Sequence, residues 1–147
     1  MASELTQEEA DFLCAMEKIC IESSKFEYPD QGGKISIPLF SLNKKEEFLL
    51  DVSRFGIDLS KNTFQNRARK TVILIRLDLA GAPHRNPDGT EIPAPHIHIY
   101  REGYGDKFAY RLPSEFSNCT SVADYLDKFM NYCNISKKPK IDIGLFV

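Results

Sequence analysis

The sequence predicts an α+β protein: a curved antiparallel β-meander with an N-terminal and a C-terminal helix packed on one face. Three observations predict this fold. Apolar residues recur at helical spacing near the two ends of the chain, the segment between them alternates as strands do, and short turn sequences separate its strands. The length of 147 residues suits one domain spanning residues 1–147.

The two helices have recognisable starts. Thr6, followed three residues later by Glu9, forms a capping box, and we expect a helix over residues 7–22. Ser121 is the expected N-cap of a second helix over residues 122–132. The apolar stripes that support the two helices are Phe12, Leu13, Met16, Ile19 and Cys20 in the first, and Val122, Tyr125, Leu126, Phe129 and Cys133 in the second.

Between the helices the chain predicts successive strands. The sequence KISIPLF (34–40) is a short strand, and its Pro38 places it at an edge or an end of the sheet. Residues 43–47 could instead begin a helix. The segment 139–147 alternates again and predicts a closing strand. The meander itself is expected over residues 48–55, 61–70, 71–81, 95–103 and 106–113.

Composition excludes several classes of protein. No apolar run approaches the roughly 18 residues of a membrane span, and the N-terminus is acidic where a secretory signal would be basic and then apolar. We therefore expect a soluble, cytoplasmic protein with no membrane partner. The four cysteines have neither zinc-ligand nor redox-pair spacing, and we expect them to be free thiols that pack as small apolar residues.

Charge is segregated along the chain. Residues 54–111 hold ten basic residues against six acidic ones, although the whole chain has a net charge of −2. All seven arginines and all three histidines fall in this segment. Because the planar guanidinium suits carboxylates and phosphates, function is expected here.

Strand alternation assigns these side chains to one face of the sheet. In the strand 71–81, the residues Ile73, Ile75, Leu77 and Leu79 are expected in the core, so that Leu74, Arg76 and Asp78 lie on the opposite, open face. The same rule sends His96, His98, Tyr100, Arg67, Lys107, Ala109 and Arg111 to that face, with Phe108, Tyr110 and Leu112 toward the core.

A proline-rich connection lies between two of these strands. In residues 81–95, the run from Asn86 to Gly89 predicts a type I turn in which the Asn86 side chain bonds its own backbone. Long, rigid connections are often functional, and this one carries His84 and Arg85.

The first functional hypothesis is cleavage of RNA without a metal ion or any other cofactor. Histidine exchanges protons near neutral pH, so His96 and His98 are the candidate base and acid, with Tyr100 as an auxiliary donor or stacking platform. The candidate phosphate-binding cations are Arg67, Arg76, Lys107 and Arg111.

Two alternatives use the same surface. His84, His96 and His98 could ligate a metal, with Asp78 or Glu102 able to complete the site. His98 and Glu102 have the spacing of a cupin motif, but no histidine follows to form a second one. Alternatively, the basic face belongs to a binding module without chemistry, whose partner is RNA or an anionic protein surface.

The block over residues 48–113 resembles an uncharacterised bacterial family, a domain of unknown function often found near mobile genetic elements. The likeness lies in TFQNR (63–67), RLDL (76–79), PHRNPDG (83–89) and PHIHIYREGYGDKFAY (95–110). The resemblance implies bacterial or phage origin and favours an RNase toxin or a host-defence antagonist over a metabolic enzyme. It implies no particular catalytic residue.

Overall fold

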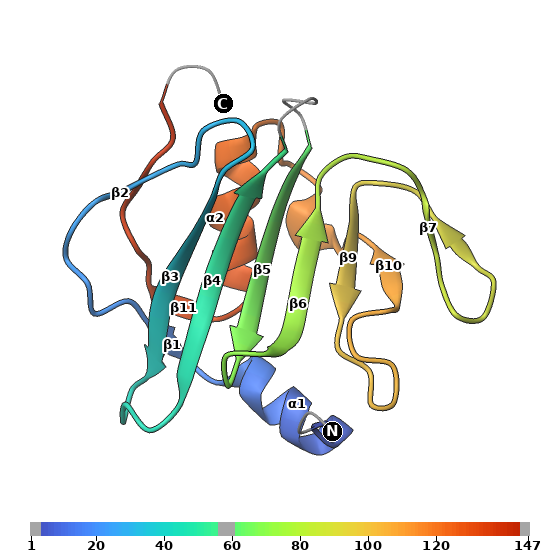
Figure 1. Cartoon of the computed structure of the whole chain (residues 1–147), viewed down its shortest axis with the longest axis horizontal. Helices are drawn as coiled ribbons and strands as arrows, with labels where there is room; N and C mark the ends of the chain where they lie inside the picture. The colour runs from blue at the N-terminus through green and yellow to red at the C-terminus, as the bar shows by residue number, and fades with distance from the viewer. Residues whose placement is uncertain (1–3, 56–60, 145–147) are drawn as a thin grey trace.

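The computed structural model describes residues 4–55 and 61–144, and within them one eight-stranded sheet dominates the fold (Figure 1). Its centre is the expected meander, in which each strand pairs antiparallel with the next. The meander consists of β3 (Lys34–Ser41), β4 (Glu47–Arg54), β5 (Asn62–Ala68), β6 (Val72–Asp78), β9 (His96–Ile99) and β10 (Ala109–Arg111).

Helices α1 (Gln7–Ala15) and α2 (Val122–Tyr132) complete the α+β fold. The capping box of Thr6 and Glu9 is present, and the Ser121 side chain accepts the N–H of Asp124 at the start of α2. In Figure 1, α2 lies behind the sheet and α1 lies near the lower ends of β5 and β6. Both helices and the sheet contribute to one hydrophobic cluster, which includes Leu13, Val52, Phe64, Leu77, Leu126 and Phe129.

The first helix ends earlier than the sequence predicts, at Ala15 instead of residue 22. Met16 is extended, and Lys18 begins the short strand β1 (Lys18–Ile19), which pairs with β3 and with the unpredicted β11 (Ile135–Lys137). The Lys18 ammonium is buried and donates to the carbonyls of Cys14, Met16 and Cys133. Strand pairing and these bonds outweigh the helical spacing that continues beyond residue 15.

Other boundaries also differ from expectation. Residues 43–47 form a turn that leads into β4, and they do not begin a helix. Within the expected closing strand, β12 (Ile141–Asp142) pairs parallel with β2 (Phe26–Glu27) in a separate two-stranded sheet, and residues 145–147 lie outside the described part. As predicted, Pro38 lies where β3 is an edge, because β1 covers only Phe40 and Ser41.

A β-bulge in β6 reverses part of the predicted alternation. Arg67 of β5 lies opposite Ile73, whereas the residue before Arg67 lies opposite Ile75, so that Leu74 is the extra residue. Leu74 and Ile75 are both buried, and Ile73 shares the face of Arg67. The predictions that Ile73 lies in the core and Leu74 on the open face are therefore wrong, because one inserted residue exchanges the two faces.

The thiols are free, as expected: Cys20 and Cys133 are buried, and Cys14 and Cys119 are half-buried. In residues 4–55 and 61–144, no helix has the length and apolar character needed to cross a membrane.

Candidate functional site

The connection between β6 and β9 is fastened to the edge of the sheet by one buried side chain. Within it, β7 (His84–Arg85) pairs with β8 (Glu91–Ile92), and the turn between them closes with a bond from the Gly89 N–H to the Asn86 carbonyl at 2.8 Å. The Asn86 side chain does not bond its own backbone, contrary to the sequence prediction. It donates to the Ala109 carbonyl at 3.0 Å and accepts the Ala109 N–H at 2.8 Å.

Histidines 96 and 98 lie beneath this connection. Cross-strand register places His96 beside Asp78 and His98 beside Arg76, on the predicted face of the sheet. That face is not open here, because the exposed fractions of His96 and His98 are 3% and 0%. The His84 ring lies 4.6 Å from the His98 ring and 6.0 Å from the His96 ring, measured between centroids.

Asp78 joins the two buried histidines. Its Oδ2 lies 3.1 Å from Nε2 of His96 and 3.1 Å from Nε2 of His98, while its Oδ1 accepts the Thr63 hydroxyl at 3.1 Å. Burial raises the pKa of the Asp78 carboxyl, but hydrogen bonding to His98, the charge of Arg76 and the Thr63 bond outweigh burial and hold this pKa well below its ordinary value. Asp78 is therefore an acceptor at neutral pH.

Both ring nitrogens of His98 are committed. Its Nδ1 must donate to the Asp106 carbonyl, 2.8 Å away, because a carbonyl only accepts. Its Nε2 lies 3.0 Å from Nη2 of Arg76 and 3.1 Å from Oδ2 of Asp78. In the neutral ring this nitrogen accepts a hydrogen bond from Arg76, and in the charged ring it donates one to Asp78. In either form no nitrogen of His98 is available to a substrate.

His84 and His96 each retain an uncommitted nitrogen. Nε2 of His84 donates to the Lys107 carbonyl at 2.7 Å, and Nε2 of His96 donates to Asp78. In the described part of the chain, Nδ1 of His84 has no hydrogen-bond partner, and Nδ1 of His96 is buried without one. An unpaired buried nitrogen costs about 1–3 kcal/mol, so a histidine with a purely structural role would be expected to avoid it.

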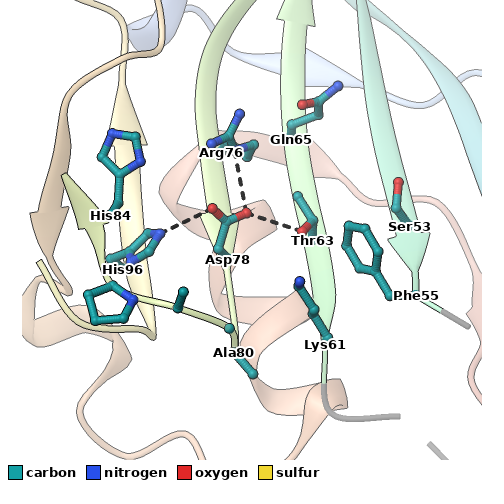
Figure 2. Close-up of a pocket in the computed structure, with 13 residues that line it drawn as sticks. Ser53, Phe55, Lys61, Thr63, Gln65, Arg76, Asp78, Ala80, His84 and His96 are labelled. Atoms are coloured by element: carbon teal, nitrogen blue, oxygen red, sulfur yellow. Dashed lines mark hydrogen bonds and ion pairs between the residues drawn. The ribbon is translucent and has the colours of Figure 1, made fainter. Parts of the chain in front are cut away.

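A surface pocket of about 470 Å³ adjoins these side chains (Figure 2). His84, His96 and Asp78 form one side, and Phe55 and Ser53 stand opposite them. Lys61, Thr63, Gln65, Arg76 and the segment from Ala80 to Pro83 complete the lining.

The two cations of the pocket differ in their partners. Arg76 bonds Asp106 through Nη1 at 2.6 Å, and its Nε lies 3.4 Å from Oδ1 of Asp78. Arg76 therefore holds the carboxylates and His98 in place. Lys61 forms no ion pair with any described carboxylate, and its ammonium lies 4.9 Å from the centre of the Phe55 ring.

Two residues predicted for the site lie elsewhere. The Arg67 guanidinium is bound by both oxygens of Asp51, whose exposed fraction is 1%, and also donates to the Lys70 carbonyl. The strand β9 ends at Ile99, so the alternation does not extend to Tyr100. Tyr100 is buried, and its hydroxyl donates to the Leu5 carbonyl.

The remaining predicted residues surround the pocket or point away from it. Arg85 pairs with Glu91 across the exposed hairpin. Lys107 contributes its carbonyl to His84, while its side chain is exposed. Arg111 lies in register with His96 and is also exposed. Glu102 accepts the Gln7 N–H at the start of α1 and cannot complete a metal site at the histidines.

Within residues 4–55 and 61–144, Asp78, His96 and His98 are the residues that could hold a metal ion. Their ligand atoms, one from each residue, lie within 4.8 Å of one another. His84, a ligand in the sequence prediction, does not belong to this group of converging ligand atoms. A dication at this triplet would lie close to the Arg76 guanidinium, which is 3.0 Å from the His98 nitrogen. Such a neighbour opposes a second positive charge.

Sequence reasoning missed several residues of the pocket. Phe55 follows the end of β4 and Lys61 precedes the start of β5, so the strand pattern carries no signal that they meet. Asp106, which orients Arg76 and His98, follows β9 in a turn. Only the alternation in β5 contained a usable signal, since it places Thr63 on the face of Gln65.

Fold and site together define an α+β protein with a polar, histidine-lined pocket beside its meander. The chain belongs to a family of unknown function, DUF6978, whose model matches residues 5–135. No curated protein and no solved structure matches the chain.

Proposed function

We propose that this protein cleaves RNA without a metal ion, and that His84 and His96 are its acid–base pair. One observation carries the proposal: two imidazoles line the same pocket, each with Nε2 bonded to a protein acceptor and Nδ1 without a described partner. Nδ1 of His96 is buried, so the proposal requires that the groups covering it move when RNA binds. A fixed ring whose second nitrogen is free is the arrangement that a general base or acid requires.

The proposed reaction uses the 2′-hydroxyl of RNA as its nucleophile. One imidazole accepts the 2′-hydroxyl proton, and the 2′-oxygen forms a bond to the adjacent phosphorus. The bond from phosphorus to the 5′-oxygen breaks, and the other imidazole, in its charged form, donates a proton to that oxygen. The products are a 2′,3′-cyclic phosphate and a 5′-hydroxyl, so the reaction needs no further reactant.

The surrounding side chains support these two roles. Lys61, which has no described ion-pair partner, is the cation available for the charge that develops on the phosphate. Asp78 accepts a hydrogen bond from Nε2 of His96 and so orients the ring, as the carboxylate of a catalytic triad does. His98 and Arg76 position Asp78 and are not themselves proposed to contact substrate.

This assignment revises the sequence hypothesis. His84 takes the place of His98 because both nitrogens of His98 are committed. Arg67 and Tyr100 have no role in the reaction. Lys107 and Arg111 are exposed near the histidines and are available to the RNA backbone beyond the pocket. A bacterial or phage origin, a cytoplasmic location and a toxin-like role remain part of the proposal.

The test is cleavage of total RNA by the purified protein in EDTA, with His84→Ala and His96→Ala beside the wild type. We expect each variant to lose about 10²–10⁴-fold in rate, the contribution of one general acid or base. Arg85→Ala is the matched control, because Arg85 lies in the same hairpin, is exposed and pairs with exposed Glu91. It should cleave at the wild-type rate.

Unchanged cleavage by either folded histidine variant would contradict the acid–base assignment. RNA binding without cleavage by the wild type would contradict the enzyme and favour the non-catalytic binding module.

A metal site at Asp78, His96 and His98 is the second candidate, favoured by the convergence of their ligand atoms within 4.8 Å. It predicts that the protein purifies with one equivalent of a transition metal, measured by elemental analysis, and that His98→Ala loses it. Metal-free protein with full RNA cleavage would exclude this candidate.

A further inference from the structure

Phe55 and Lys61 form an unusual pair at the edge of the pocket. Phe55 directly follows β4, and its exposed fraction is 44%, although a large apolar side chain gains free energy when it is covered. The Lys61 ammonium lies 4.9 Å from the centre of its ring. The Phe55 N–H donates to the Lys61 carbonyl at 3.1 Å, so the two backbones are joined as well.

The position of Lys61 depends on a glycine in the opposite wall. Gly81 has a φ of +125°, and a methyl group added there would lie 3.3 Å from Cε of Lys61. The lysine stem therefore passes close to the bare backbone of Gly81. Figure 2 shows Lys61 between Ala80, which precedes this glycine, and the Phe55 ring. Lys61 thus lies between the Gly81 backbone and an exposed aromatic face.

The floor beside Phe55 offers polar groups. Gln65 lines the pocket; its amide nitrogen donates to Asp51, and its carbonyl oxygen has no hydrogen-bond partner in the described part of the chain. Ser53 also lines the pocket, and its hydroxyl has no partner in the described ranges. An aromatic face, a cation and free polar groups are the features that bind a nucleotide: the base stacks, the phosphate pairs, and the base edge is hydrogen-bonded.

We propose that the Phe55–Lys61 pair is a nucleotide subsite for single-stranded RNA, in which one base stacks on Phe55 while an adjoining phosphate contacts Lys61. This inference rests on the proposed function and extends it, because it specifies an unpaired substrate strand. A base within a duplex is stacked on both faces and cannot cover the Phe55 ring.

The test uses the fluorescence of a single introduced tryptophan as its reporter. The chain has no tryptophan, so Phe55→Trp introduces a single indole at the subsite. The probe is a single-stranded hexanucleotide of 2′-O-methyl RNA, which lacks the nucleophilic hydroxyl and is not cut. We expect its bases to stack on the indole and quench the tryptophan fluorescence with saturable dependence on concentration.

Three controls identify the contact. Phe12→Trp places an indole on α1 at a side chain with an exposed fraction of 67%, and its fluorescence should not respond. An abasic hexanucleotide retains the phosphates and should not quench Phe55→Trp. Lys61→Ala, combined with Phe55→Trp, should weaken the quenching titration without changing the fold, as judged by circular dichroism.

A second readout does not depend on the indole. Fluorescence anisotropy of a labelled hexanucleotide should show about 5- to 150-fold weaker binding by Phe55→Ala, which corresponds to the loss of one stacked base. Phe55→Tyr should restore the affinity. Wild-type affinity in Phe55→Ala, or equal quenching by the abasic strand, would overturn the subsite.

The two proposals fail differently. Quenching by a protein that never cleaves RNA supports the subsite and contradicts the proposed function. Normal cleavage and normal affinity in Phe55→Ala contradict the subsite and leave the acid–base pair intact.

Discussion

Asp78 is the residue on which the arrangement of the histidines depends. Its Oδ2 lies 3.1 Å from Nε2 of both His96 and His98, and Thr63 and Arg76 bind its other oxygen. Because these contacts favour the ionised form, its pKa lies below the ordinary value of 3.8. The unfolded chain therefore binds more protons than the folded one in acid, and folding is weakened there.

The first prediction at this scale concerns stability against pH. The contribution of ionised Asp78 is fully present well above pH 3.8, and it is lost as the pH falls through 3.8 toward the lower pKa of the folded state. Asp78→Asn should therefore reduce the free energy of unfolding at neutral pH by about 1–3 kcal/mol. Its stability should also depend less on pH in the acid range, measured by urea unfolding at a series of pH values.

Asp127→Asn is the matched control, because Asp127 forms an exposed ion pair with Lys138. Exposed pairs contribute about 0–1 kcal/mol, so this variant should retain the acid dependence of the wild type. If Asp78→Asn lost stability in acid as steeply as the wild type, Asp78 would not be the group responsible for the acid dependence of the free energy of unfolding.

At the scale of single elements, the hairpin of β7 and β8 determines where His84 lies. Asn86 bonds the backbone of Ala109 through both atoms of its amide and so occupies the hydrogen-bonding edge of β10. This contact also covers an edge that would otherwise expose unpaired backbone groups. The hairpin is thus fixed to the sheet at the strand that follows His98 in the meander.

Asn86→Ala should release the hairpin. Two buried backbone groups of Ala109 lose their partner, and we expect a loss of about 1–3 kcal/mol in stability. Hydrogen exchange at Ala109 should accelerate, and RNA cleavage should fall because His84 is no longer held against His98. Asp88→Ala removes an exposed acceptor of the Thr90 N–H within the same turn and leaves the Asn86 contact with Ala109 in place, so it serves as the control.

Protected exchange at Ala109 in Asn86→Ala would contradict this role of the hairpin. So would an Asp88→Ala variant that loses cleavage to the same extent.

Most elements of the fold could be predicted because they depend on local signals. The strands of the meander alternate, and both helix starts carry a capping residue. The residue at which α1 ends could not be predicted, because it depends on the pairing of β1 with β3 and β11, which are distant in sequence. The bulge at Leu74 could not be predicted either, because it lies in a run of apolar residues in which no residue differs from its neighbours. The sequence therefore assigns Ile73 and Leu74 to the wrong faces.

The candidate site could be predicted only in part, for the same reason. Alternation correctly places Arg76, Asp78, His96 and His98 on one face. It contains no information about the hairpin that covers them or about the contact of Asn86 with Ala109. Which histidine retains a free nitrogen follows from these tertiary contacts alone.

At the scale of the whole molecule, the arginine-rich segment does not form the open basic face that the sequence predicts. Most arginines of the segment 54–111 that were expected to bind phosphate or form a basic surface are paired with carboxylates of the same chain. The pairs are Arg67 with Asp51, Arg69 with Glu46, Arg76 with Asp106 and Arg85 with Glu91. Because these arginines are paired, the groups that remain for a ligand are those of the pocket, Lys61 and the histidines. This favours a small binding site over an extended basic surface.

The central claim is that two histidines cleave RNA through its own 2′-hydroxyl, without a metal. The most direct measurement compares three oligonucleotides of one sequence in EDTA: RNA, its 2′-O-methyl form and DNA, with identification of the product ends. The account predicts that only RNA is cut and that the fragments carry a 2′,3′-cyclic phosphate and a 5′-hydroxyl. Cleavage of DNA, fragments with a 5′-phosphate, or cleavage that appears only when a metal ion is added would contradict it.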